Sequence, residues 1–152
     1  MLRSPNTSPY DDTLAPTPGL RELDGLLDAS RSVGLSVTRH DAGDARPLSD
    51  AAERAAHRVV QEALTNVHKH VGGATAEVDV RFLADTLEVT VRNTAPPGRA
   101  PDEGALPGSG LGLVGLRERL ALMGGRLHAG PDPDGGFTVR ARIPAAPLRE
   151  PR

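Results

Sequence analysis

Polar side chains in the segment 61–70 have the types and spacing that phosphate chemistry needs. Glu62 and Asn66 are four residues apart, Lys69 follows three residues later, and His70 is next to it. Residues three or four apart lie on the same side of a helix. An amide oxygen can bind Mg²⁺, a carboxylate can hold or polarise a water molecule, and an ammonium can neutralise a phosphate. For this segment alone, a solvated helix edge is the simpler explanation, because such triplets arise by chance.

A glycine-rich segment forms the second candidate motif. The stretch GSGLGLVGLRERL contains Gly108, Gly110, Gly112 and Gly115 and leads into a predicted helix. Glycines let backbone amides come close to phosphates, and the N-terminus of a helix favours anions. The segment does not follow a strand directly and lacks the P-loop lysine, so it matches neither common nucleotide fingerprint. By itself a glycine cluster is a weak signal.

Hydrophobic periodicity places both motifs in one α+β domain. The pattern predicts helices over 18–34, 50–70 and 113–125, and strands over 35–39, 76–83, 87–93, 126–130 and 136–144. Asp50 and Glu53 predict a capping box at the start of the second helix. Neighbouring strands joined by short turns imply a two-layer α/β sandwich, with a mixed, mostly antiparallel sheet and helices packed on one face.

The composition of the chain predicts its domain boundaries, and the first residues are polar and contain several prolines. Residues 1–17 are predicted to be a disordered leader, 18–146 the folded domain and 147–152 a tail. The segment 94–110 is rich in glycine and proline and longer than most connections in a compact domain, so it is predicted to be functional or disordered.

Composition narrows the classes of partner and compartment. The formal net charge of −2 gives no field that would attract nucleic acid or an anionic membrane. No cysteine is present, which excludes disulfides and thiolate metal sites. No apolar run approaches the roughly 20 residues needed to span a bilayer, and the first residues do not form a signal peptide. A cytoplasmic domain without membrane contact is expected, although a longer parent protein could carry a membrane anchor.

Taken together, the two motifs resemble the ATP-binding domain of sensor histidine kinases, which has the Bergerat, or GHKL, fold. HRVVQEALTNVHKH is similar to the N-box of that family, and GSGLGLVGLRERLALMGG is similar to its G2 box and the following helix. GLRERLALMGG and the closing GGFTVRARIP resemble the NarL/DesK-like subfamily, especially its actinobacterial members. The resemblance covers about residues 18–146, with the boxes in the family's order and about forty residues apart.

The resemblance implies ATP and Mg²⁺ as cofactors and gives the candidate residues their roles. Glu62 would hold the water near the γ-phosphate or act as the base, and Asn66 would be the Mg²⁺ ligand. Lys69 and His70 would contact phosphates. The lid and the phosphate side would be lined by Gly108, Gly110, Leu111 and Gly112.

Two regions of the chain depart from the family's pattern. Its G1 box usually reads Asp-x-Gly, with the Asp accepting a hydrogen bond from the adenine amine, whereas this chain has Asn93, Thr94 and Ala95. An Asn oxygen can still accept that bond, with less charge. Near the last strand the family has a threonine where this chain has Phe137, with Thr138 one place later. Asn93 and Thr138 are the expected nucleotide contacts in this region.

The resemblance also implies partners and leaves alternatives open. The partner would be a dimerisation and phosphoacceptor domain and, through it, a response regulator, because none of the five histidines has the phosphoacceptor context. A serine kinase of the anti-sigma-factor type and a degenerate, non-enzymatic interaction module are the two alternatives. GLRERLALMGG favours the histidine kinase over the serine kinase, whereas Asn93, Ala95 and Phe137 keep the degenerate module open. A monomer is expected.

Overall fold

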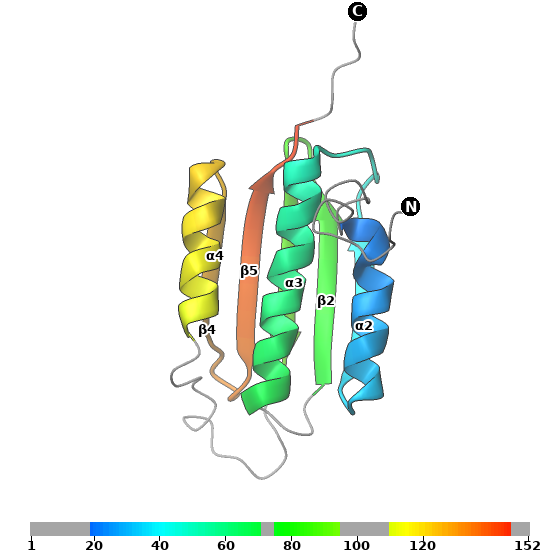
Figure 1. The fold of residues 1–152 in the computed structure, drawn as a ribbon, viewed down its shortest axis with the longest axis vertical. Helices are drawn as coiled ribbons and strands as arrows, with labels where there is room; N and C mark the ends of the chain where they lie inside the picture. The colour runs from blue at the N-terminus through cyan, green and yellow to red at the C-terminus, as the bar shows by residue number, and fades with distance from the viewer. Residues whose placement is uncertain (1–18, 71–74, 95–109, 147–152) are drawn as a thin grey trace, which may run out of the picture.

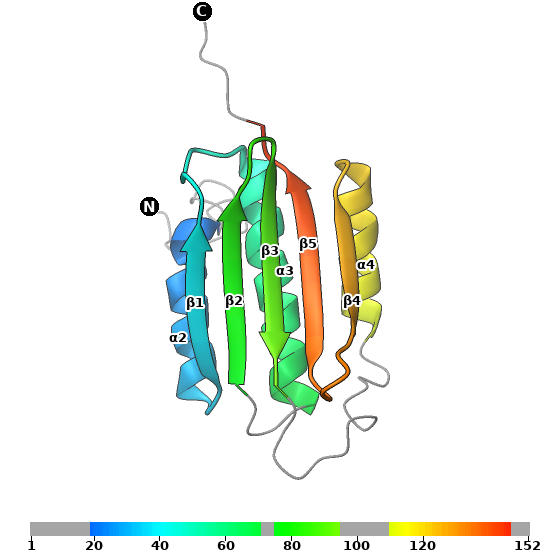
Figure 2. The ribbon, with the colours of Figure 1, turned by 180° about the vertical axis from the view of Figure 1, so that it is seen from behind.

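Helices cover one face of a five-stranded sheet in the computed structural model (Figures 1 and 2), which describes residues 19–70, 75–94 and 110–146. Along the chain, the elements of these described residues are η1 (Leu20–Glu22), α2 (Leu23–Ser32), β1 (Ser36–Ala42), α3 (Asp50–His70), β2 (Thr75–Phe82), β3 (Thr86–Asn93), α4 (Gly110–Leu122), β4 (Arg126–Pro131) and β5 (Phe137–Pro144). The long helix α3 lies lengthwise over the centre of the sheet, with α2 on one side of it and α4 on the other (Figure 1).

The sheet is mixed and mostly antiparallel. Its strand order is β1-β2-β3-β5-β4, in which β1 and β2 are parallel and the other neighbouring pairs are antiparallel. Figure 2 shows the sheet from its other side, which no described helix covers. The predicted α+β class, with a mixed sheet and helices on one face, is confirmed.

The core lies between α3 and the central strands. Leu87, Val89 and Val91 alternate along β3 and point toward the helices, where they meet side chains of α3 such as Val59 and Leu64. Aromatic residues make up only 2% of the chain, so leucine, valine and alanine fill this core. Burying one valine or leucine side chain contributes about 1.5–3 kcal/mol, so this layer fixes α3 on the sheet.

The predicted range 50–70 of the second helix is confirmed, and the helices differ from the predictions in three other details. The first predicted helix is divided into η1 and α2. The N-cap of α3 is Ser49, whose Oγ accepts from the amide of Ala52, instead of the predicted Asp50. The carboxylate of Glu53 accepts a bond from the amide of Leu20 at 2.7 Å and so joins η1 to α3. Helix α4 begins and ends three residues earlier than predicted, so the glycine motif lies in its first turns.

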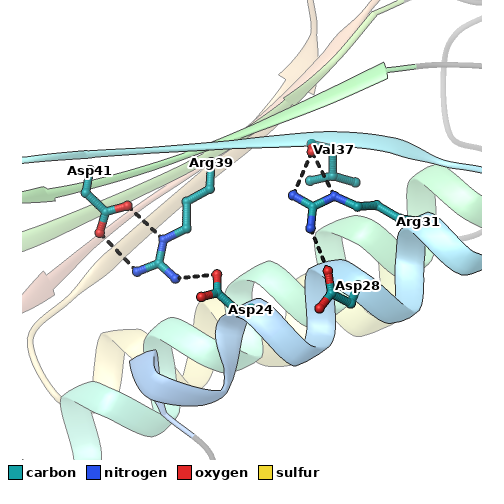
Figure 3. A network of polar contacts seen from close by, with 6 residues as sticks. All are labelled: Asp24, Asp28, Arg31, Val37, Arg39 and Asp41. Carbon is teal, nitrogen blue, oxygen red and sulfur yellow. Dashed lines mark hydrogen bonds and ion pairs between the residues drawn. The ribbon is translucent and has the colours of Figure 1, made fainter.

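Polar contacts fix α2 against the edge strand β1 (Figure 3). The guanidinium of Arg31 donates to the main-chain oxygen of Val37 from Nε at 3.1 Å and from Nη2 at 2.8 Å. Arg39 forms two bonds to Asp41, at 2.7 and 3.0 Å, and one of 3.2 Å to Asp24 on α2. The hydrogen bond with Asp41 raises the pKa of Arg39 above its ordinary value, so this cation stays charged.

No helix in the described part of the chain is both long enough and apolar enough to cross a membrane. The 21 residues of α3 would be long enough, but charged residues on its outer side exclude it.

Candidate functional site

The two sequence motifs meet at one end of the fold. Helix α3 finishes there, α4 begins there, β3 ends there and β5 starts there, at the lower end of the view in Figure 1. The strand register places Asn93, the last residue of β3, opposite Phe137, the first residue of β5. Polar residues from distant parts of the chain are therefore gathered at one end of the helix-covered face.

Glu62 and Gly112 are in direct contact. Glu62 is half-buried on α3, and a Cβ atom added to Gly112 would overlap its carboxylate oxygen Oε1. A side chain at position 112 would have to push this carboxylate aside, so glycine lets the backbone of α4 lie against Glu62 in its observed position. The contact joins the carboxylate of the first motif to the glycines of the second.

Asn66 lies one helical turn beyond Glu62 and is unusually buried for a polar residue. Only 6% of its surface is exposed, and its Nδ2 has no hydrogen-bond partner among the described residues. A buried amide without a partner costs about 1–3 kcal/mol, so such groups generally serve a ligand or a water molecule. Rotation of the amide by half a turn would present its carbonyl oxygen in the same place.

Asn93 is a buried polar residue that ends β3 at this end of the fold. It is 4% exposed, and its Nδ2 donates to the main-chain oxygen of Thr94 at 3.1 Å. With the amide nitrogen engaged, the Oδ1 atom is the part of the side chain that can accept a bond from a ligand. On the β5 side, a Cβ at Gly136 would overlap the main-chain oxygen of Asn93, so this glycine allows the turn before β5 to pack against it.

Two threonines hold Asn93 in place and were not predicted as site residues. The amide of Thr94 donates to the main-chain oxygen of Thr75 at 2.9 Å, and the Thr94 hydroxyl accepts from the amide of Thr75 at 3.1 Å. These bonds join the end of β3 to the start of β2. No local motif predicts this pairing, whereas the Gly135-Gly136 pair was a visible signal for the close approach at Asn93.

Thr138 does not join the other predicted residues. Its hydroxyl donates to the carboxylate of Asp132, at 2.8 and 3.0 Å, and its register partner is Arg92. Side chains alternate along a strand, so Thr138 lies on the opposite face of the sheet from Phe137 and from Asn93. The hydroxyl therefore serves the turn between β4 and β5.

The remaining predicted residues lie at the end of α3 or at the start of α4 and just before it. Lys69 and His70 are the last two residues of α3, and Gly110 and Leu111 are the first two of α4. Gly108 lies outside the described residues, as do the side chains of the other four.

The electrostatics of this end suit an anion held together with a divalent cation. The first turn of α4 carries no acidic residue, so no side chain of its own neutralises the positive end of its dipole. The described residues contain no group of three or more His, Asp or Glu side chains that could hold a metal ion alone. Mg²⁺ needs only one or two protein oxygens when phosphates and waters complete its shell, and Asn66 with Glu62 fits that mode.

Comparison with known proteins gives consistent relatives. The family described as histidine kinase-, DNA gyrase B-, and HSP90-like ATPase matches residues 51–147. The sensor histidine kinase LnrJ of Bacillus subtilis (strain 168) is 29% identical over 119 residues, covering 78% of this chain and 28% of LnrJ. DesK, a sensor histidine kinase of the same strain, is 34% identical over 91 residues, covering 56% of this chain and 22% of DesK.

The fold also resembles solved structures. The mycobacterial sensor histidine kinase MprB superposes with a TM-score of 0.59 at 20% sequence identity, covering 84% of this chain and 96% of that one. This likeness concerns the fold. The chain spans less than a third of the length of the two curated relatives. Because the family match covers well over half of its residues, the chain belongs to the histidine kinase-, DNA gyrase B-, and HSP90-like ATPase family.

Proposed function

We propose that this chain binds ATP with Mg²⁺ at the joined ends of α3, β3 and α4, as the catalytic domain of a sensor histidine kinase. One observation carries the proposal: the buried amide of Asn66, whose Nδ2 has no hydrogen-bond partner in the described part of the chain, lies one helical turn from Glu62, which itself contacts Gly112 at the start of α4. A ligand that brings phosphates and a divalent cation would satisfy all three features.

Each residue then has a part in phosphoryl transfer. The Asn66 oxygen would hold Mg²⁺, which would neutralise charge on the phosphates. The first turn of α4 and Lys69 would face the phosphates, and Asn93 Oδ1 would accept from the adenine amine. Glu62 would position a water beside the γ-phosphate or take the proton of the attacking imidazole. The bond between the γ-phosphorus and its bridging oxygen breaks, a phosphorus–nitrogen bond forms, and ADP leaves.

The acceptor would be a histidine on a dimerisation domain, from which a response regulator would receive the phosphoryl group. The relatives support this part, since LnrJ and DesK are sensor histidine kinases and are much longer than the matched segment. A cytoplasmic location follows from the proposed use of ATP.

A second candidate function has one observation in its favour. Asn93 is a buried neutral amide, and the resemblance aligns it with a carboxylate in the family's pattern. A weaker adenine contact suits a module that has lost activity and uses the fold to bind another protein. Phosphoryl transfer separates the two candidates, because only the first predicts that Glu62 matters for a rate.

The test is transfer from ATP to a supplied phosphoacceptor domain of a NarL/DesK-like kinase. We expect Glu62→Gln to leave ATP affinity unchanged and to slow transfer by about 10²–10⁴-fold, the usual cost of losing a general base. Thr65→Ala is the matched control, because Thr65 is exposed on α3 between Glu62 and Asn66. Equal, small effects of the two substitutions would instead support a solvated helix edge.

A further inference from the structure

A groove runs between α3 and α4 on the side that faces away from the sheet. Its volume is about 380 Å³, and both helices contribute to its walls. The two helices lie side by side in front of the sheet in Figure 1. The groove is distinct from the site described above, because neither Asn66 nor Asn93 lines it.

The floor of the groove is apolar and is built mainly from small or flexible side chains. Ala51 and Ala55, one turn apart on α3, face Leu116 and Leu120 on α4 and Met123 just after it. Two alanines one turn apart leave room for side chains of another helix to enter. Methionine adapts its shape to such a ligand and is common at binding surfaces.

The rim of the groove is cationic. Arg54 and Arg58 on α3 and Arg119 on α4 line it and are exposed, and no acidic side chain is among the lining residues. Within the described part of the chain, no ion pair is formed by any of these three arginines. Burial lowers the pKa of His57, against the opposing charge of Glu22, so this lining imidazole is neutral at pH 7 and the rim charge comes from the arginines.

We propose that this groove docks an acidic, amphipathic helix of a partner protein. Apolar side chains of that helix would enter the floor, and its carboxylates would pair with Arg54, Arg58 and Arg119. The α3 wall extends from Ala51 to Gln61. At 1.5 Å per residue this length is about 15 Å, which matches roughly three turns of a bound helix.

Solvated arginines at a helix edge would be the simple alternative, and two features argue against it. Arg54 and Arg58 are four residues apart on the same side of α3, and like charges at that spacing destabilise a helix by about 0.2–0.5 kcal/mol. They also flank a hollow with an apolar floor, where an acidic helix would relieve that repulsion.

The position of the groove suggests what the docked helix would do. Gln61, at one end of the groove, is next to Glu62, and Leu116 lies one turn beyond Gly112. A helix in the groove would therefore end beside the Glu62–Gly112 contact. If the proposed kinase function holds, this partner helix would be brought to the phosphoryl-transfer site, but docking itself needs no nucleotide.

Two synthetic peptides of about four helical turns test the proposal. Both carry leucines at i, i+4 and i+7, with flanking glutamates in one and lysines in the other. We expect the glutamate peptide to bind the wild-type chain by fluorescence anisotropy, with weaker binding at high salt, and the lysine peptide not to bind. Arg54→Glu with Arg58→Glu should weaken glutamate-peptide binding at least tenfold and give measurable binding of the lysine peptide.

Matched variants separate groove docking from general charge attraction. Arg126→Glu with Arg140→Glu makes the same charge change on the uncovered face of the sheet, where both residues are exposed, and should leave peptide binding unchanged. Ala55→Phe fills the floor without changing charge and should weaken binding, with folding checked by circular dichroism. Failure of the glutamate peptide to bind, or equal losses in both charge-reversed variants, would overturn the proposal.

The same charge-reversed variants keep this inference separate from the kinase proposal. Titrating each with ATP and Mg²⁺ should give the wild-type affinity, because the groove residues lie outside the nucleotide site. Lost peptide binding with normal ATP binding would confirm that the groove is an independent surface. Loss of both would show that the charge reversals disturb the fold. In that case the proposal is tested by whether Ala55→Phe, in a folded chain, weakens binding of the glutamate peptide.

Discussion

At the scale of single residues, the contact between Glu62 and Gly112 is the structural detail on which the chemistry depends most. The position of the Glu62 carboxylate is limited by α4, because the space it occupies would otherwise hold a side chain of residue 112. Gly115 is one turn further along the same helix, and a Cβ there would meet nothing within 4 Å. The two glycines therefore form a natural pair for an experiment.

We expect Gly112→Ala to displace the Glu62 carboxylate and to slow phosphoryl transfer by at least tenfold. Gly115→Ala should leave transfer unchanged and stabilise the chain, because alanine is about 1 kcal/mol better than glycine inside a helix. Transfer rates and thermal unfolding of both variants provide the measurement. A Gly112→Ala variant as active as Gly115→Ala would show that Glu62 is not fixed by this contact.

Asn93 gives the second prediction at the residue scale. A carboxylate at the pocket floor would accept the adenine amine more strongly, since hydrogen bonds to charged groups contribute about 1.5–3 kcal/mol against roughly 1 for neutral pairs. Asn93→Asp should therefore tighten ATP binding by up to about tenfold, because 1.4 kcal/mol is one decade. The gain is limited by desolvation and by loss of the bond from Nδ2 to Thr94.

GTP is the control ligand for Asn93→Asp, because guanine has an oxygen where adenine has the donor amine. Its affinity should not rise, so the preference for ATP over GTP should increase. If both affinities are unchanged in a folded variant, Asn93 is not the adenine contact.

The sequence predicted the site residues unevenly, and the reason is physical. Glu62 and Asn66 share one helix, so their spacing alone placed them together, and the structure confirms that placement. Thr138 was predicted from a family position one residue away, and in a strand a shift of one residue changes the face. The pairing of Thr75 with Thr94 depends on sheet register, which the residues do not reveal locally.

At the scale of elements, the uncovered face of the sheet carries a row of charges in register. Arg81 on β2, Glu88 on β3, Arg142 on β5 and Arg126 on β4 are successive partners across the sheet. Glu88 is 7% exposed, and its carboxylate lies 3.2 Å from Nε of Arg142 and 3.6 Å from Nη1 of Arg81. The buried carboxylate of Glu88 thus lies between Arg81 and Arg142, which would otherwise repel each other.

We expect Glu88→Gln to lower the free energy of unfolding by about 1 kcal/mol, because the hydrogen bond from Arg142 loses its charged acceptor and both neighbouring arginines lose their counter-charge. The matched control is Glu77→Gln, because Glu77 is an exposed residue of β2 on the same face of the sheet as Glu88. Urea unfolding of the two variants measures the difference. Equal midpoints would contradict a stabilising role for the buried carboxylate.

The positions of the strands could be predicted from the sequence, whereas their pairing and the start of α4 could not. Alternation predicted all five strands to within three residues at each end, because one face of each is buried. The parallel pairing of β1 with β2 and the position of β5 between β3 and β4 come from tertiary contacts, which local patterns do not contain. The early start of α4 at Gly110 was missed because glycine-rich segments favour loops.

At the scale of the whole molecule, the fold gathers its unusual polar features at one end. The unpartnered amide of Asn66, the contact of Glu62 with Gly112 and the buried Asn93 all lie where α3 and β3 finish and α4 begins. The groove between α3 and α4 lies on the outer side of these helices, in the halves nearer the opposite end, and approaches the polar end at Gln61 and Leu116. The two proposals together give the molecule a nucleotide site and a separate surface for a partner.

Isothermal titration calorimetry of the chain with ATP, with and without Mg²⁺, tests the central claim most directly. We expect one ATP per chain at micromolar or weaker affinity, equivalent to about 8 kcal/mol or less, with tighter binding when Mg²⁺ is present. Asn66→Ala should remove the gain from Mg²⁺ and leave the Mg²⁺-free affinity unchanged. Absence of heat and of any thermal shift at millimolar nucleotide, in a folded wild-type chain, would contradict the account.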